Sequence, residues 1–182
     1  MQQNNLRRIL ILATLLLGTT MSAQADRYAD CDQWDDLDLQ VRSCTEIVQH
    51  GSHETKAARY KAHINRGHTY LLREEPALAL ADGTRAITPN ETSALAFGLR
   101  GLAHADMGQK NQAIVDFTQA ITLDPLIAEA YYNRSNIYSE LGQYDKAIAD
   151  LDKAIDLNPN DAATRLCRGN AYANKGEYER AI

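Results

Sequence analysis

Arginine and aspartate side chains recur at regular intervals after residue 60 and are the first candidates for chemistry. Each arginine follows the previous one by 34 residues, so the guanidinium groups could form a stripe that binds phosphate. However, an aspartate follows sixteen residues after each of the first three arginines and would neutralise it. We therefore expect partly buried ion pairs within each repeat that orient two packed helices. The arginines are Arg66, Arg100, Arg134 and Arg168, and the aspartates are Asp82, Asp116 and Asp150.

Five histidines are the candidate metal ligands. His50 and His53 are three residues apart, and His63 and His68 follow in a predicted helix. Zinc needs three or four ligands that converge in a tetrahedron, whereas residues five apart lie on different faces of a helix. His104 stands in a column of tyrosines, which favours a packing role. The pattern therefore predicts no metal site, and a histidine-based metal-binding protein is the alternative that metal analysis would test.

Cys31 and Cys44 lie thirteen residues apart near the N-terminus. We expect them to form a disulfide in an oxidising compartment, where closing a loop of about 14 residues contributes about 3 kcal/mol. Two unpaired buried thiols are the alternative. Cys167 is expected to be a packing residue. No Cys-x-x-Cys, nucleophile-elbow, phosphate-loop or His-Glu-x-x-His pattern occurs, so we predict neither an enzyme nor a bound cofactor.

The first 25 residues have the pattern of a cleavable signal peptide. Arg7 and Arg8 precede an apolar run over 9–17, and a polar stretch with small residues ends at Ala25. The run is shorter than the roughly 20 residues that a spanning helix needs, which argues against an uncleaved anchor. We therefore predict cleavage after Ala25, no membrane attachment afterwards, and a periplasmic or secreted protein.

Composition and charge fit a globular chain that does not bind polyanions. The 182 residues are 45% hydrophobic and 24% charged, which excludes collagen-like and strongly disordered classes. The net charge of −5 becomes −7 without the signal peptide, because that segment has two arginines and no acid. An acidic surface disfavours nucleic acid and anionic lipid as partners.

The chain repeats with a period of 34 from residue 60 onward. Small and large side chains recur at fixed phase, as two packed helices require, because Gly or Ala on one lets a ring or branched chain on the other approach closely. A Gly followed by Gln or Glu breaks three repeats near the middle, and Asp124-Pro125 and Asn158-Pro159 end two of them. The recurring columns are Gly67, Gly101, Ser135, Gly169; Tyr70, His104, Tyr138, Tyr172; and Ala79, Ala113, Ala147, Ala181.

These columns resemble the tetratricopeptide repeat (TPR), a 34-residue helix pair that stacks into a solenoid with a concave binding groove. The resemblance implies an all-α fold with three full repeats, 60–93, 94–127 and 128–161, and a partial fourth, 162–182. No run alternates like a strand, which agrees with a helix-turn-helix array.

Residues 26–59 are predicted to be an N-terminal cap held by the disulfide. Asp35 to Gln49 resembles the second helix of a degenerate repeat, with Val41, Cys44 and Val48 on one face.

The first and last repeats depart from the pattern. The first has Gly83 where the next two have Phe117 and Leu151, and its Pro89 comes two residues early, so its second helix is of uncertain length. The sequence stops at Ile182, inside the expected second helix of the fourth repeat. We interpret this as a fragment of a longer protein; the alternative is an open end used for self-association.

The resemblance places the first helix of each repeat along the groove. The groove is then apolar at one end and rich in amides at the other, and Asn can bond one donor and one acceptor of an extended peptide backbone. The alternative is that the leucines are core residues. The cations that bind a C-terminal carboxylate in chaperone-binding members are missing, which disfavours a cochaperone. The predicted peptide-binding residues are Ile64, His68, Leu95, Leu102, Tyr132, Asn133, Asn136 and Asn170.

The sequence thus predicts an exported α-solenoid that binds a protein or peptide partner as an interaction module or assembly scaffold. An accessory array of a larger enzyme or wall-associated protein is the other alternative.

Overall fold

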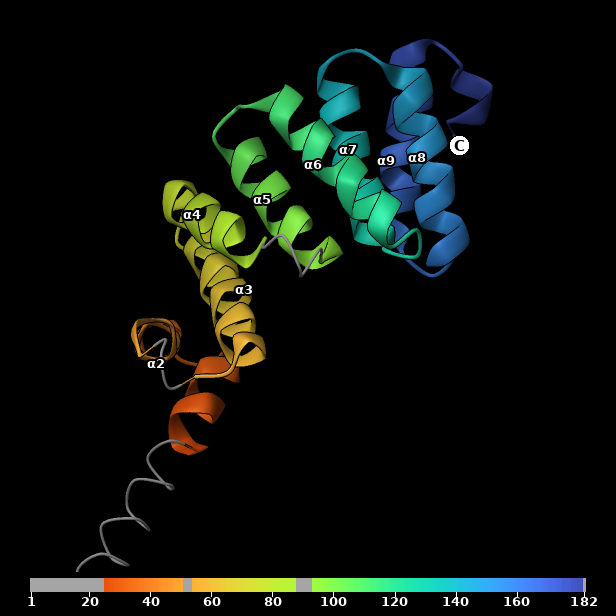
Figure 1. The fold of residues 1–182 in the computed structure, drawn as a ribbon. Helices are drawn as coiled ribbons and strands as arrows, with labels where there is room; N and C mark the ends of the chain where they lie inside the picture. The colour runs from red at the N-terminus through yellow and green to blue at the C-terminus, as the bar shows by residue number, and fades with distance from the viewer. Residues whose placement is uncertain (1–24, 51–53, 88–92, 182) are drawn as a thin grey trace, which may run out of the picture. The chain divides into compact units, whose positions relative to one another are not determined.

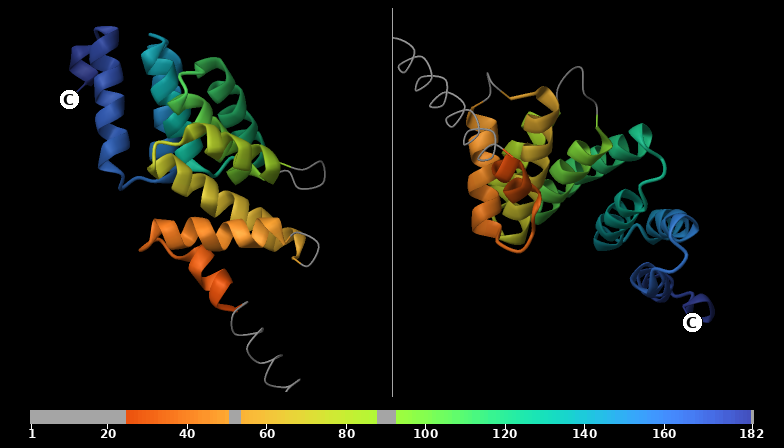
Figure 2. Two further views of the ribbon diagram at one scale, coloured as in Figure 1. Left: turned by 90° about the vertical axis from the view of Figure 1, so that its left-hand side faces the viewer. Right: turned by 90° about the horizontal axis from the view of Figure 1, so that it is seen from below.

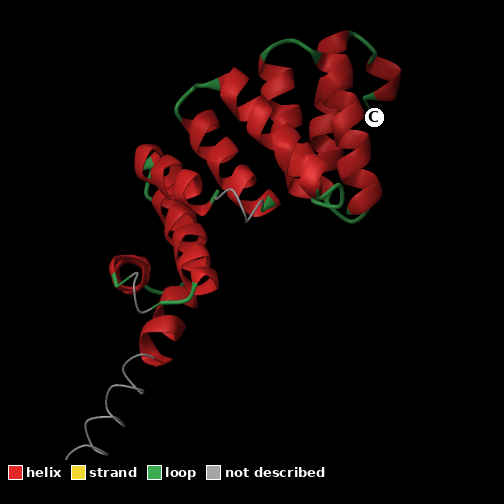
Figure 3. Cartoon of the chain, in the orientation of Figure 1, coloured by secondary structure: helices red, strands yellow, loops and turns green. Residues whose placement is uncertain are grey.

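The computed structural model describes residues 25–50, 54–87 and 93–181, and these residues form helices joined by loops, with no strand among them (Figure 3). The predicted signal peptide lies outside the described residues except for Ala25. Within the described part of the chain, no helix is long and apolar enough to cross a membrane.

The chain divides into two compact units, residues 1–69 and 70–182, which we describe separately. The division falls inside helix α3 (Lys56–Leu72). The first helix of the first predicted repeat therefore belongs mostly to the N-terminal unit, and not to the array as a boundary at residue 60 would have it.

The first unit contains a helix at 25–32, helix α2 (Leu37–Gln49) and most of α3 (Figure 1). Asp36 caps α2, because its carboxylate accepts a hydrogen bond from the Leu39 amide at 2.9 Å. Cys31 and Cys44 form the predicted disulfide, with their Cα atoms 4.8 Å apart.

The buried face of α2 differs from the predicted one. Gln40, Ser43, Cys44 and Ile47 are buried, whereas Val41 and Val48 are only partly covered. The bridge to the helix at 25–32 fixes the side of α2 that carries Cys44. Residues three and four away from Cys44 then share its burial, polar Gln40 included.

The second unit is a succession of helix pairs from α4 to α9 (Figures 1 and 2). Each helix from α5 to α8 packs on the next, and α5, α7 and α9 also make successive contacts with each other. The bounds are α4 Pro76–Ala86, α5 Ala94–Asp106, α6 Lys110–Leu123, α7 Ala128–Glu140, α8 Tyr144–Leu157 and α9 Ala162–Lys175.

Small residues permit this packing at specific places. A Cβ on Gly101 would lie 2.9 Å from the Phe117 ring, which is itself 1% exposed. Gly83 plays a different part, because a Cβ there would lie 3.1 Å from both the backbone nitrogen and the Cβ of Arg100. The missing large residue of the first repeat is thus replaced by a close approach of α5.

Left-handed residues make the turns inside the repeats. Gly108, Gly142 and Gly176 have φ values of 71°, 70° and 89°. Glu74 holds the corresponding position of the first repeat and has φ 59°, which a side chain disfavours.

The two irregular ends of the array also differ from regular repeats. Helix α4 has 11 residues against 14 in α6 and α8, consistent with the early proline. After α9, residues Tyr178–Arg180 form a 3-10 helix where the sequence predicted the start of an α-helix. A Cβ on Gly169 would lie 2.9 Å from the Ala181 carbonyl oxygen, so this short segment packs closely on α9.

Helix α2 corresponds in register to the second helix of a repeat. Arg66 donates a hydrogen bond to Thr45 at 2.8 Å, as Arg134 does to Thr118 at 2.9 Å. Matching the two threonines places three buried residues of α2 in the small, large and small columns of α6. These are Gln40, Cys44 and Ile47, matched with Ala113, Phe117 and Ala120.

Candidate functional site

The recurring arginines and aspartates form ion pairs in the two middle repeats. Arg100 donates from Nε and Nη2 to Asp116 at 2.8 and 2.6 Å, and Arg134 binds Asp150 in the same way at 2.8 and 2.7 Å. The pKa of each arginine is raised, chiefly by the hydrogen bond to its aspartate. Because both oxygens of each buried carboxylate are used, these cations are neutralised and do not offer an anion site.

The outer members of the column behave differently. Arg66 and Asp82 belong to separate units: Arg66 donates to Thr45, and buried Asp82 lies 4.0 Å from Arg85. Arg168 pairs with Asp152 on the preceding helix at 2.8 Å. The sequence analysis missed this pairing, although Asp152 lies sixteen residues before Arg168, the same interval in the opposite direction.

The apolar residues of the predicted groove lie on α5. Leu95 is 53% exposed, and a Cβ on Gly98 would meet no atom within 4 Å, so this face of α5 is open. Leu102 is half-buried and packs against the cluster that includes Phe117. Leu95 therefore offers apolar surface, whereas Leu102 divides its surface between the core and the outside.

The polar residues of the predicted groove lie on α7 and α9. The Tyr132 hydroxyl is 3.7 Å from the Cys167 thiol and is also hydrogen-bonded by Asn136. The pKa of Tyr132 is raised, chiefly by the bond to Cys167. Asn170 is exposed, and Asn133 and Asn136 are half-buried.

Of the predicted groove residues, Ile64 and His68 lie in the first unit. Ile64 is 8% exposed, so it presents little surface to a ligand. His68 Nδ1 donates to the Ile64 carbonyl oxygen at 3.0 Å, which occupies that nitrogen. These two residues act mainly within their own helix.

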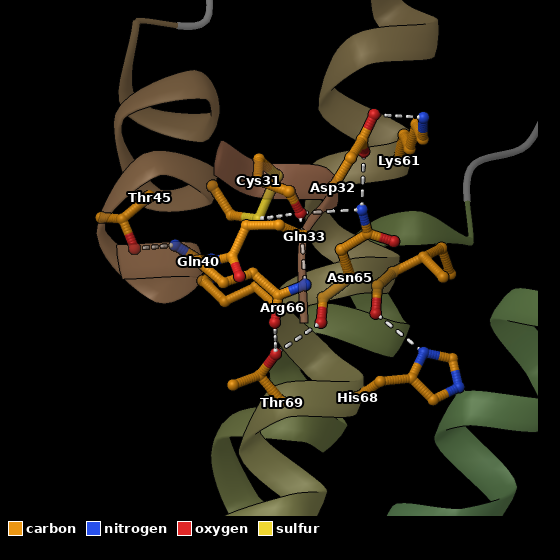
Figure 4. Close-up of a disulfide and its surroundings, with 12 residues drawn as sticks. Cys31, Asp32, Gln33, Gln40, Thr45, Lys61, Asn65, Arg66, His68 and Thr69 are labelled. Carbon is orange, nitrogen blue, oxygen red and sulfur yellow. Dashed lines mark hydrogen bonds and ion pairs between the residues drawn. A yellow bond between two sulfur atoms is a disulfide. The ribbon is translucent and has the colours of Figure 1, made fainter. Parts of the chain in front are cut away.

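A polar network surrounds the disulfide of the first unit (Figure 4). The Cys31 carbonyl accepts hydrogen bonds from Gln40 Nε2 at 3.3 Å and from Asn65 Nδ2 at 3.0 Å. Gln40 in turn accepts from the Thr69 hydroxyl, and Asp32 pairs with Lys61 at 2.6 Å. The network therefore joins the helix at 25–32 to both α2 and α3.

The described residues hold no cluster of three His, Cys, Asp or Glu side chains that could bind a metal. His53, one of the candidate ligands, lies outside them.

Three tetratricopeptide family models match the second unit. They cover residues 94–125, 117–149 and 135–176, described as tetratricopeptide or TPR repeats. The all-α fold of packed helix pairs is accordingly that of a TPR protein. TPR modules are protein-interaction scaffolds that bind protein or peptide partners.

Solved TPR structures superpose on most of the chain. One crystal structure of MamA is 26% identical, with a TM-score of 0.73 over 90% of this chain and 87% of that one. MamA from Desulfovibrio magneticus is 18% identical, with a TM-score of 0.73 over 88% of each chain. YrrB, described as a TPR protein with an unusual peptide-binding site, is 18% identical, with a TM-score of 0.63 over 80% of this chain and 73% of its own. A search of curated proteins finds no match.

Proposed function

We propose that the protein is an exported interaction module that binds a polypeptide segment along α5, α7 and α9. The observation that carries this proposal is the pattern of outward side chains on these helices. Leu95 and Leu166 are 53% and 66% exposed, and Asn136 and Asn170 lie at equivalent positions, 34 residues apart. Repeated positions along one surface suit a ligand with its own repeat, such as an extended peptide.

The division of labour along this surface follows from chemistry. Asn136 and Asn170 each carry a donor and an acceptor, so they can bond the peptide backbone without selecting a side chain. Leu95 beside the open position at Gly98 provides apolar surface that selects the ligand's side chain. Because Arg100 and Arg134 are paired with aspartates, the proposed ligand is an internal segment and not a C-terminal carboxylate.

Export is the second part of the proposal. The signal-peptide pattern of residues 1–25 supports it, and so does the Cys31–Cys44 disulfide, since such bonds persist in oxidising compartments. Fractionation of cells that produce the full chain, followed by N-terminal sequencing, should find a periplasmic or secreted protein that begins at Asp26. A cytoplasmic protein with an intact N-terminus would contradict this part.

The binding site is tested by selecting peptides from a displayed library and measuring their affinities for variants. Asn136→Ala should weaken many peptides alike, by about 1 to 3 kcal/mol if its contacts are desolvated. Leu95→Lys should change which peptides are selected. Leu126→Lys is the matched control, because Leu126 is 75% exposed in the turn before α7, away from the proposed surface. Equal effects of the two Leu→Lys changes would contradict the site.

A further inference from the structure

A hollow of about 280 Å³ lies between α5 and α6 and takes no part in the proposed peptide surface. Pockets for whole small molecules have volumes of about 300–1,000 Å³, so this one is at the lower limit and suits a single side chain. Its lining residues are Arg100, His104, Asn111, Gln112, Val115 and Asp116.

The third repeat shows what fills the equivalent space. His104 corresponds to Tyr138, 34 residues later. The Tyr138 ring faces the Arg134 guanidinium at 5.8 Å and the Lys146 ammonium at 5.3 Å. Arg134 and Lys146 correspond to Arg100 and Gln112, which line the hollow. The hollow therefore occurs where a phenol ring is replaced by the smaller imidazole.

The fourth repeat repeats the arrangement of the third. The Tyr172 ring is faced by Arg180 at 4.2 Å, and Arg180 also donates to the Tyr172 hydroxyl at 2.6 Å. An aromatic ring against a cation is thus the occupant that this chain uses twice at this position. Attraction between a guanidinium and the face of a ring favours such an arrangement.

The walls of the hollow are held in place without an occupant. Arg100 is fixed by its two hydrogen bonds to Asp116, and His104 Nδ1 lies 2.6 Å from Gln109 Oε1. Val115 is 65% exposed, so one wall is apolar and open to the outside. The site therefore combines a fixed cation, apolar surface and two amide side chains, Asn111 and Gln112.

We propose that this hollow binds the aromatic side chain of a partner polypeptide, a tyrosine in particular, in the place that Tyr138 fills in the next repeat. The ring lies against Arg100 and Val115, and the hydroxyl reaches the amides of Asn111 and Gln112. Buried aromatic anchors in pockets are typical of the residues that dominate protein interfaces. The site is distinct from the surface of α5, α7 and α9 and does not depend on peptide binding there.

The test uses p-cresol, the side chain of tyrosine, titrated into the full chain and followed by NMR. We expect saturable shifts of the Asn111 and Gln112 side-chain amides and the Val115 methyl groups. His104→Tyr should fill the hollow and lower the affinity at least tenfold, whereas Tyr138→His should create a second site. 4-Methylcyclohexanol, which has no π face, should bind more weakly.

Three results would overturn the proposal. The first is p-cresol binding that His104→Tyr leaves unchanged, and the second is shifts that map elsewhere. The third is an absence of binding by p-cresol, including the case in which sedimentation shows a dimer that His104→Tyr dissociates, since the occupant would then be a second copy of the chain. None of these results bears on Asn136 or Leu95, so failure here is distinguishable from failure of the proposed peptide site.

Discussion

The two units of the molecule hold equivalent helix pairs together by different means. In the second unit Gly101 lets the Phe117 ring approach closely, and Arg100 binds Asp116 beside it. In the first unit the position matched to Phe117 is Cys44, and its bond to Cys31 is covalent.

The difference shows what a short repeat lacks. The helix at 25–32 provides few side chains, and the buried cluster of the first unit contains only Cys31, Cys44, Ile47 and Ala62. Apolar burial contributes about 25 cal/mol per Å², so such a cluster gives little stability without a ring. A disulfide supplies stability that does not depend on area, because it restricts the unfolded chain.

Breaking the disulfide should have the largest effect. Cys31→Ser with Cys44→Ser removes the loop constraint, and we expect the first unit to lose about 3 kcal/mol. Trp34 is the sole tryptophan and lies in this unit, so its fluorescence reports urea unfolding there. Circular dichroism at 222 nm follows all the helices, and the transition of the second unit should be unchanged.

Cys167→Ser is the matched control, since Cys167 is the free cysteine of the described residues. Equal midpoints for Trp34 in the double variant and the unaltered protein would show that the polar contacts of Cys31 and Asp32 suffice.

Breaking one ion pair of the second unit should have the next largest effect. Arg134→Ala leaves the 9% exposed carboxylate of Asp150 unpaired, which should cost about 1 to 3 kcal/mol in unfolding free energy. Arg165→Ala, at an exposed position of α9, should change stability little. If Arg134→Ala lowered peptide affinity and left the thermal midpoint unchanged, the arginine would be a binding residue.

The turn of the first repeat offers a change that stabilises. Glu74→Gly removes the penalty of a side chain at φ 59°, and we expect a gain of about 1 kcal/mol. Gly108→Ala is the reverse change at the corresponding position, where φ is 71°, and should lose about 1 kcal/mol. Thermal unfolding of both variants measures the pair of effects, and equal signs would contradict the explanation.

The smallest expected effect concerns acid stability at the start of α9. Asp161 accepts hydrogen bonds from Thr164 and from the Ala163 amide, and these hold its pKa below the ordinary value of 3.8. Its contribution is therefore complete above that value and is lost as the pH falls through the lower pKa of the folded protein. Asp161→Asn should lower the thermal midpoint slightly at pH 7 and not at pH 2. An equal difference at both pH values would exclude the charge as the cause.

The sequence predicted the regular part of the fold because its information is periodic. A 34-residue column of Gly, Tyr and Ala fixes which helices pack, and the two middle repeats pair Arg100 with Asp116 and Arg134 with Asp150 as the spacing indicated. The left-handed turn at Glu74 was also readable, because the glycine at that position in three repeats identifies it.

The irregular parts were not predictable from periodicity. The buried face of α2 depends on the bridge from Cys31, so Gln40 and Ile47 replace the expected valines. His104 was correctly recognised as an exception to the tyrosine column. The hollow beside it depends on the sizes and positions of Gln112 and Val115, which only the packed helices determine.

The arginine column has a consequence for how the array unfolds. Arg134 binds Asp150 in its own repeat and Thr118 in the preceding one, at 2.9 Å, and Arg168 binds Asp152 across the same kind of boundary. Each arginine thus adds to the nearest-neighbour coupling between repeats as well as to the intrinsic stability of one. In a linear array, strong coupling suppresses fraying of single repeats and makes neighbours melt together. Amide hydrogens of α6, α7 and α8 should therefore exchange through one shared opening event.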